Sequence, residues 1–172
     1  MTRLLARTAL ALACATSAPL ALRAQAAAAA QPAGKTPDFS GTWELNLAKS
    51  QFGEAGAPTK GTMVITQAGD RITRLQTITS PMGEMKNTMH HAIGAATTDT
   101  IQMGPQSGTF TSTARLDGRT MVVDGKIAVQ GIELPVVSRY TLSPDGKQLL
   151  VDQTISTPGG EQAQHFVFDK KS

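Results

Sequence analysis

The sequence predicts an all-β protein, an antiparallel up-and-down barrel of about eight to ten strands. Turn-forming Gly, Asp and Pro recur at intervals of roughly 8 to 12 residues between Thr- and Val-rich stretches, which is the spacing of short antiparallel strands. Helical periodicity is nearly absent, so no crossover helices are expected between the hairpins. Closing so many strands into a barrel also protects the sheet edges. A two-sheet sandwich is the alternative architecture.

Alternating polar and apolar residues between turns place the individual strands. We expect strands at 42–47, 61–67, 71–79, 84–93, 98–103, 108–116, 119–129, 132–142, 147–157 and 162–170. In the fourth of these, alternation puts Met85, Met89 and His91 on one mostly apolar face. In the last, Phe166 faces away from His165.

Turn chemistry supports these boundaries. Residues 143–147 read S-P-D-G-K, with a proline suited to a type I turn and Gly146 available for a left-handed residue, which predicts a three-residue hairpin loop with a bulge. Asp124 and Gly125 follow the preceding turn too soon to begin a new strand, and predict a β-bulge. Asn46 is placed to cap a single helical turn within residues 46–52.

Residues 38–53, D-F-S-G-T-W-E-L-N-L-A-K-S-Q-F-G, contain the only tryptophan of the chain, Trp43, two residues after Gly41. This segment resembles the Gly-x-Trp opening of a group of bacterial secreted lipocalin-like, calycin-type β-barrel proteins, which are largely uncharacterised. Residues 142–149 and the closing residues 168–170 resemble the same group. The resemblance implies a structural Trp43 that plugs one barrel end beneath Lys170 or Lys171.

The chain departs from two better-known kinds of barrel. It lacks the disulfides and the clear C-terminal helix of secreted lipocalins. It also lacks the glycine-rich continuation after the tryptophan that is found in haem-binding nitrobindin-like barrels. Haem ligation by His165 is therefore not expected, and we expect no cofactor.

Residues 1–26 have the features of a secretory signal peptide. Arg3 and Arg7 precede an apolar run at 10–22, and small residues at 24 and 26 suit a cleavage site. Pro19 and Arg23 interrupt the run, so a membrane span is not expected. Cys14 fits a lipoprotein signal only in part. We expect a periplasmic or secreted protein with an Ala- and Pro-rich tether at 27–37 and one barrel domain at 38–172.

Charge and composition exclude several functions. The full chain has 16 Lys and Arg, of which three precede residue 27, so 13 remain against 13 Asp and Glu. A neutral mature chain with 4% aromatic residues gives no reason to expect a nucleic-acid partner. The only cysteine lies in the signal segment, so the mature chain has no thiol or disulfide. We expect a monomer.

The candidate ligand-binding residues lie on the strand faces that we infer to point inward. As a set they combine flexible apolar side chains with two polar groups. They are Met85, Met89, His91, Tyr140 and Phe166. Tyr140 has an alternative role as a core residue bonded to nearby backbone. Met89 and His91, roughly 7 Å apart on one strand face, could hold copper only with a ligand from another strand, so no metal site is predicted.

No motif for catalysis is present. The sequence has no Gly-x-Ser-x-Gly elbow, and the carboxylates Glu44, Glu133 and Asp152 are explained as solvated strand charges. The leading hypothesis is a barrel that binds a small, mainly apolar molecule. The alternatives are a structural or interaction module of the cell envelope with a filled barrel, and an isomerase or hydrolase on the same scaffold. An open lumen distinguishes the first and third from the second.

Overall fold

The computed structural model describes residues 36–53, 56–81 and 83–171. All of these residues belong to one compact unit, which does not include residues 1–30. The predicted signal peptide, Cys14 and most of the predicted tether therefore lie outside the described residues.

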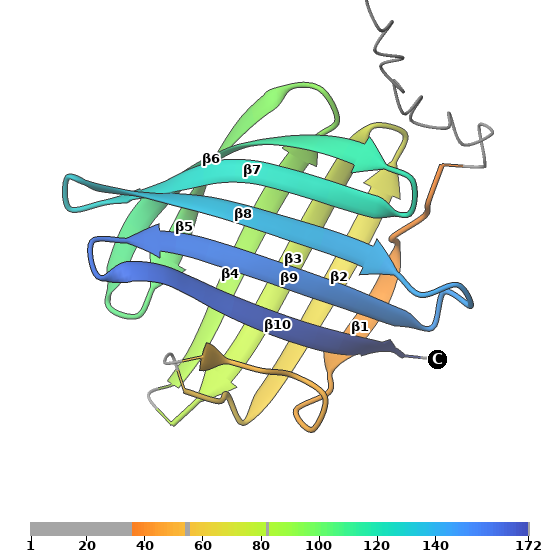
Figure 1. Ribbon diagram of the computed structural model, residues 1–172, viewed down its shortest axis with the longest axis horizontal. Helices are drawn as coiled ribbons and strands as arrows, with labels where there is room; N and C mark the ends of the chain where they lie inside the picture. Colours follow the sequence, from red (N-terminus) through yellow and green to blue (C-terminus); the bar gives the residue numbers. More distant parts are fainter. Residues whose placement is uncertain (1–35, 54–55, 82, 172) are drawn as a thin grey trace, which may run out of the picture. The chain divides into compact units, whose positions relative to one another are not determined.

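All ten predicted strands are present in one antiparallel sheet, and the predicted fold class is confirmed (Figure 1). The sheet order is β4-β3-β2-β1-β10-β9-β8-β7-β6-β5, so consecutive strands pair with each other except β4 and β5, which form the two ends of the sheet. The strands are β1 (Gly41–Leu45), β2 (Lys60–Ala68), β3 (Arg71–Ser80), β4 (Gly83–Ala92), β5 (Ala96–Met103), β6 (Gln106–Asp117), β7 (Thr120–Val129), β8 (Ile132–Leu142), β9 (Gln148–Thr157) and β10 (Gly160–Lys170).

The sheet folds into a nearly closed barrel of two layers. Figure 1 shows β6 to β10 crossing steeply over the strands of the other layer. The first and last strands pair through a regular ladder that includes Trp43 opposite Lys170. Between β4 and β5 the ladder is interrupted, and isolated bridges join Ala92 to Ala95 and Ile93 to Ala114 beyond the end of β4. The barrel is thus fully paired on one side and incompletely paired on the other.

Strand alternation fills the interior with apolar side chains. In β7, Met121, Val123 and Ile127 are buried in the same cluster as Trp43 and Phe168. Polar residues occupy most of the alternate positions, so the barrel needs no helix to cover its outer face.

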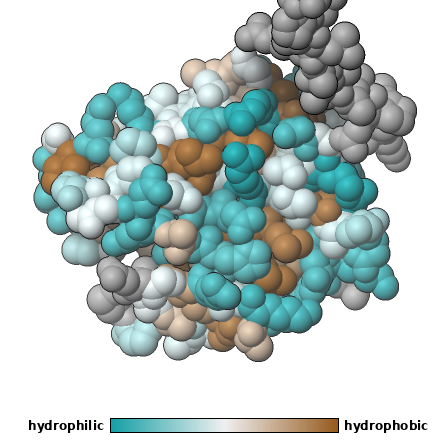
Figure 2. Space-filling model, viewed as in Figure 1, coloured by the Kyte–Doolittle hydropathy of each residue, from teal (hydrophilic) through white to brown (hydrophobic). Residues whose placement is uncertain are grey.

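Figure 2 shows the outer face over β6 to β10 as mainly hydrophilic, with hydrophobic side chains in small separate patches. Among the described residues, the exposed large apolar side chains are Leu47, Val64, Leu75, Met103, Ile132 and Val137. No helix in the described part of the chain could cross a membrane.

The predicted β-bulge at Asp124 and Gly125 is wrong. Both residues pair in regular register on both sides, Gly125 with Ser112 and with Val136. A Cβ on Gly125 would lie 2.8 Å from Phe110 Cε2 and 2.8 Å from Ser112 Cβ. The glycine therefore leaves room for the side chains of Phe110 and Ser112 on β6. A glycine within a strand can indicate either a bulge or close packing, and the local sequence does not distinguish the two.

Two loops also differ from expectation. Residues 47–49 form a turn instead of a helical turn, although Asn46 acts as the predicted cap because its Oδ1 accepts from the Lys49 amide at 3.1 Å. In the β8–β9 hairpin the Gly146 amide donates to the Ser143 carbonyl at 2.9 Å, and Gly146 has φ +69°, as the predicted turn requires. The loop contains four residues instead of three, because Ser143 pairs with Gln148.

Candidate functional site

A cavity of about 190 Å³ lies inside the barrel. Side chains from both layers line it because inward positions of β3 and β4 face those of β6 to β10. The lining residues are Arg74, Gln76, Ile78, Met85, Asn87, Met89, Phe110, Val123, Ile127, Val136, Ser138, Tyr140, Gln153, Gln164 and Phe166. The cavity combines an apolar wall with several side-chain amides, two hydroxyl groups and one guanidinium.

A second, larger pocket adjoins this cavity at one end of the barrel. Its volume is about 500 Å³, and the segment after β1 and the β3–β4 turn form its rim. In Figure 1 both segments lie at the same end of the barrel. The lining residues that it shares with the central cavity are Gln76, Ile78, Met85, Gln164 and Phe166. The remainder are mainly small or apolar, including Phe52, Ala57, Pro58 and Pro81. We call this the mouth pocket.

The structure places four of the five predicted ligand-binding residues around the central cavity. Met85, Met89, Tyr140 and Phe166 line it, although they come from β4, β8 and β10. Tyr140 is 2% exposed, and no hydrogen bond joins its hydroxyl to backbone among the described residues. His91 is also inward, but it is not part of the lining.

Arg74 is the cavity residue that sequence reasoning missed. It follows Ile72 on the inward face of β3, and only 7% of it is exposed. Its Nη1 donates to Gln76 Oε1 at 2.8 Å, and its Nη2 contacts the sulfur of Met89. The guanidinium carbon lies 5.4 Å from the ring centroid of Tyr140, a cation–π contact across the barrel. The sequence did contain a signal for this residue, because Arg74 lies two positions after Ile72 and therefore on the same face of the strand.

His91 is buried beside the cavity and remains uncharged. Only 2% of it is exposed, and its ring meets Phe110 edge-on with centroids 6.5 Å apart. Burial, followed by the positive charge of Arg74, lowers the His91 pKa to about 4, against a smaller opposing effect of Asp99. Its Nδ1 lies 3.5 Å from Ser112 Oγ, and its Nε2 has no hydrogen-bond partner among the described residues.

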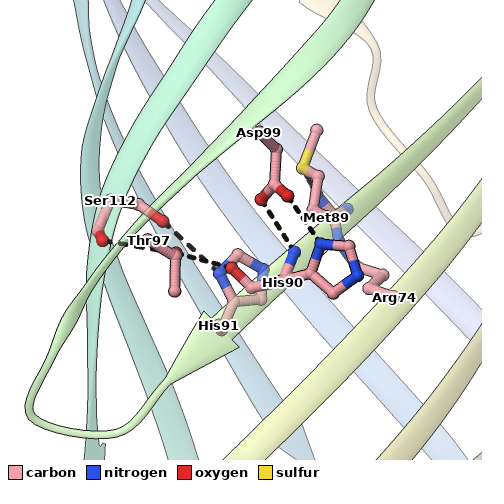
Figure 3. Close-up of polar contacts among 7 residues, drawn as sticks. All are labelled: Arg74, Met89, His90, His91, Thr97, Asp99 and Ser112. Carbon is pink, nitrogen blue, oxygen red and sulfur yellow. Dashed lines mark hydrogen bonds and ion pairs between the residues drawn. The ribbon is translucent and has the colours of Figure 1, made fainter.

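The gap between β4 and β5 is bridged by side chains. In Figure 3, His90 and His91 point away from each other. The Asp99 carboxylate accepts a hydrogen bond from the backbone amide of His90 at 2.8 Å, and its other oxygen lies 2.6 Å from the ring Nδ1 of His90. Nearer the mouth, Asn87 donates to the Gln102 carbonyl at 3.0 Å and accepts from the Gln102 amide at 2.7 Å. These contacts replace the missing backbone ladder, and we call them the β4–β5 seam.

Trp43 is fully buried at the end of the barrel where β1 pairs with β10. Its Nε1–H donates to the Phe39 carbonyl at 3.1 Å, and the Lys170 ammonium lies 5.1 Å from the ring centroid. A Cβ on Gly41 would lie 2.8 Å from Lys170 Cε, so glycine at this position leaves room for the lysine above the tryptophan. The structure thus pairs Trp43 with Lys170, the first of the two lysines that the resemblance implied.

The other candidate groups lie apart from the cavity. His165 Nδ1 bonds Asp152 at 2.6 Å, and Glu133 pairs with Lys126 at 2.6 Å. No group of three His, Cys, Asp or Glu able to hold a metal occurs in the described ranges. The sulfur of Met89 contacts the positively charged Arg74 guanidinium, which disfavours binding of a metal cation at this sulfur. Among the described residues, the cavity lining contains neither a carboxylate nor a histidine that could act as an acid or base.

Comparison with solved structures supports the fold. The chain resembles the zebrafish ileal bile acid-binding protein complexed with cholic acid, with a TM-score of 0.51, 18% identity, and coverage of 77% of this chain and 98% of that one. It also resembles secretory abundant heat soluble protein 4 from Ramazzottius varieornatus, with a TM-score of 0.50, 14% identity, and coverage of 81% and 100%. At these identities the likeness shows the fold alone, an antiparallel β-barrel. No protein-family model matches the sequence, and no curated protein matches it either.

Proposed function

We propose that this protein is a carrier that binds a small, mainly apolar molecule inside its barrel. The observation that supports this most directly is the continuity of the two hollows, since the central cavity shares five lining residues with the mouth pocket. Ligand sites generally occupy about 300–1,000 Å³, so the mouth pocket is needed to bring the site into this range. The resemblance to a barrel that holds cholic acid supports the same conclusion.

The lining favours binding over catalysis. A hydrolase or isomerase on this scaffold needs a proton donor or acceptor facing the substrate. The described lining contains amides, hydroxyls and a guanidinium, and the one buried histidine with a lowered pKa lies outside the cavity. These groups can orient a ligand but are poorly suited to transfer protons at neutral pH.

A titration with a neutral environment-sensitive fluorophore, 1-aminoanthracene, tests the carrier proposal. We expect saturable binding that weakens strongly in Met89→Trp, because the indole would occupy the cavity. Thr88→Trp is the matched control, since this neighbour on the same strand is exposed and should leave binding unchanged. Absence of binding to the wild-type protein would favour a filled structural or interaction module.

Copper provides a second discriminating probe. It should not reproduce the saturable response at the same concentrations, because the Met89 sulfur already contacts a cation. A tight stoichiometric copper site that is lost in both Met89→Ala and His91→Ala would replace the carrier proposal with a metal-binding one.

We further propose that the carrier acts as a monomer outside the cytoplasm, in the periplasm or the medium. The basic, apolar and small-residue segments of 1–26 support export, and the small separate apolar patches of the barrel surface support a monomer. N-terminal sequencing of exported protein should find a start between Gln25 and Ala27. A lipid-modified start at Cys14 would contradict the soluble carrier.

A further inference from the structure

The interior of the barrel contains a positive charge without an opposite charge to balance it. Arg74 is 93% buried, since its exposed fraction is 7%, and it forms no ion pair among the described residues. Its contacts are a neutral amide, a thioether and an aromatic ring. Because arginine does not lose its proton in proteins, burial cannot neutralise it as it neutralises His91.

Leaving such a charge inside a protein is strongly unfavourable unless it is paired and hydrogen-bonded. The described cavity lining offers no carboxylate. Asp99 already uses both carboxylate oxygens on His90 in the β4–β5 seam. In addition, Nε of Arg74 is buried with no hydrogen-bond partner among the described residues. The guanidinium therefore has both charge and a free donor available to a bound molecule.

From these contacts we propose that Arg74 binds an oxyanion carried by the ligand, such as a carboxylate or a sulfonate. This inference rests on the carrier function proposed above and specifies its ligand class as an amphipathic anion. Arginine suits this role because its planar donors match the two oxygens of such a group. Gln76, which already holds Nη1, fixes the orientation of the guanidinium.

The shape of the site assigns an orientation to this ligand. The central cavity of about 190 Å³ accommodates the anionic group and a short apolar portion. The mouth pocket, with Phe52, Ile78 and Phe166 in its lining, accommodates the rest of the apolar skeleton. The anionic end therefore lies deep against Arg74 and the apolar end points to the mouth.

Displacement of 1-aminoanthracene by octanoate and by octan-1-ol tests the proposal, because these probes share a chain length and differ in charge. Wild-type protein should bind octanoate about tenfold or more tightly than the alcohol, the usual effect of one charged hydrogen-bonding partner. Arg74→Met should abolish or reverse this preference, and Arg74→Lys should retain part of it. Arg71→Met, which removes an exposed positive charge from the same strand, should retain all of it.

The unliganded variants give an independent measurement. Arg74→Met should melt at or above the wild-type temperature, because it replaces an unpaired buried charge with an apolar side chain of similar length. A large decrease in melting temperature would mean that the protein itself balances the charge, and would overturn the anion site.

The outcomes separate this inference from the carrier function. Equal affinity of wild-type protein for octanoate and octan-1-ol, or an unchanged preference in Arg74→Met, overturns the anion site while the carrier proposal stands. Failure of the wild-type protein to bind 1-aminoanthracene, octanoate or octan-1-ol overturns both.

Discussion

Arg74 and His91 lie on paired strands and are both buried, but they respond to burial in opposite ways. The guanidinium keeps its charge, whereas the imidazole loses its proton because burial and the nearby Arg74 charge lower its pKa to about 4. Arg74 is consequently the charged group that the cavity presents to a ligand at neutral pH.

The lowered His91 pKa predicts a pH-dependent stability. In the unfolded chain the imidazole regains its ordinary pKa of 6.5, so between pH 6.5 and 4 the unfolded state binds a proton that the native state does not. The free energy of unfolding should therefore be highest above pH 6.5 and fall by about 3 kcal/mol as the pH decreases to 4. Urea unfolding at a series of pH values measures this change.

His91→Gln is the control for this pH dependence, because the amide has a similar size and does not titrate. The variant should lack the part of the decrease between pH 6.5 and 4 that belongs to His91. Parallel stability curves for the variant and the wild-type protein would show that the imidazole is not responsible.

Trp43 is the residue whose truncation should damage the fold most. Its ring is fully buried, and it is held by the Phe39 carbonyl and covered by Lys170. Trp43→Ala should lower the free energy of unfolding by about 3 to 5 kcal/mol through lost burial and a cavity. Chemical denaturation followed by circular dichroism measures the loss, and Trp43→Phe should recover part of it. Unchanged stability would mean that the ring is exposed in solution.

At the scale of elements, a glycine in β7 leaves room for residues of the neighbouring strand β6. Gly125 lies in unbroken register, and an added Cβ would meet the side chains of Phe110 and Ser112 and the Thr111 carbonyl, each at 2.8 Å. Because the Thr111 contact is with backbone, a simple rotamer change cannot relieve it. Gly125→Ala should destabilise the barrel by about 1 to 3 kcal/mol through overpacking.

Gly159→Ala is a matched control for this substitution in the β9–β10 hairpin. Its added Cβ would meet only Thr157 Oγ1, at 3.7 Å, and its backbone does not require glycine. Thermal melts of the two variants should therefore differ, with a clear loss for Gly125→Ala and little change for Gly159→Ala. Equal melting temperatures would mean that the barrel accommodates the added Cβ and that Gly125 has no packing role.

For the molecule as a whole, the β4–β5 seam is the place where barrel closure depends on side chains. The Asn87 side chain donates one hydrogen bond to the Gln102 backbone and accepts another from it, in place of the backbone hydrogen bonds that a regular ladder would provide. Asn87→Ala should speed hydrogen exchange at the Gln102 amide and lower stability by about 1 kcal/mol or somewhat more. Exchange measured by NMR for each amide should show the effect concentrated along β4 and β5.

Glu84→Ala tests whether this effect is specific to the seam. Glu84 is exposed on the same strand and pairs with Lys86, and no hydrogen bond joins its side chain to β5 among the described residues. Exchange at the Gln102 amide should be unchanged in this variant. A comparable increase in both variants would mean that β4 opens as a unit regardless of Asn87.

The sequence by itself determined the all-β class, the ten strands and the pairing of consecutive hairpins. It also predicted the inward face of β4 that includes Met85 and Met89. These features are local, because side-chain alternation and turn chemistry act over a few residues.

Only the tertiary structure decided which residues meet across the barrel. Arg74 and Tyr140 come from opposite layers, and their contact depends on how the sheet curves and closes. The separation of His91 from the cavity, the regular register at Gly125 and the side-chain seam between β4 and β5 have the same origin. Each depends on packing between residues distant in sequence, which strand periodicity does not specify.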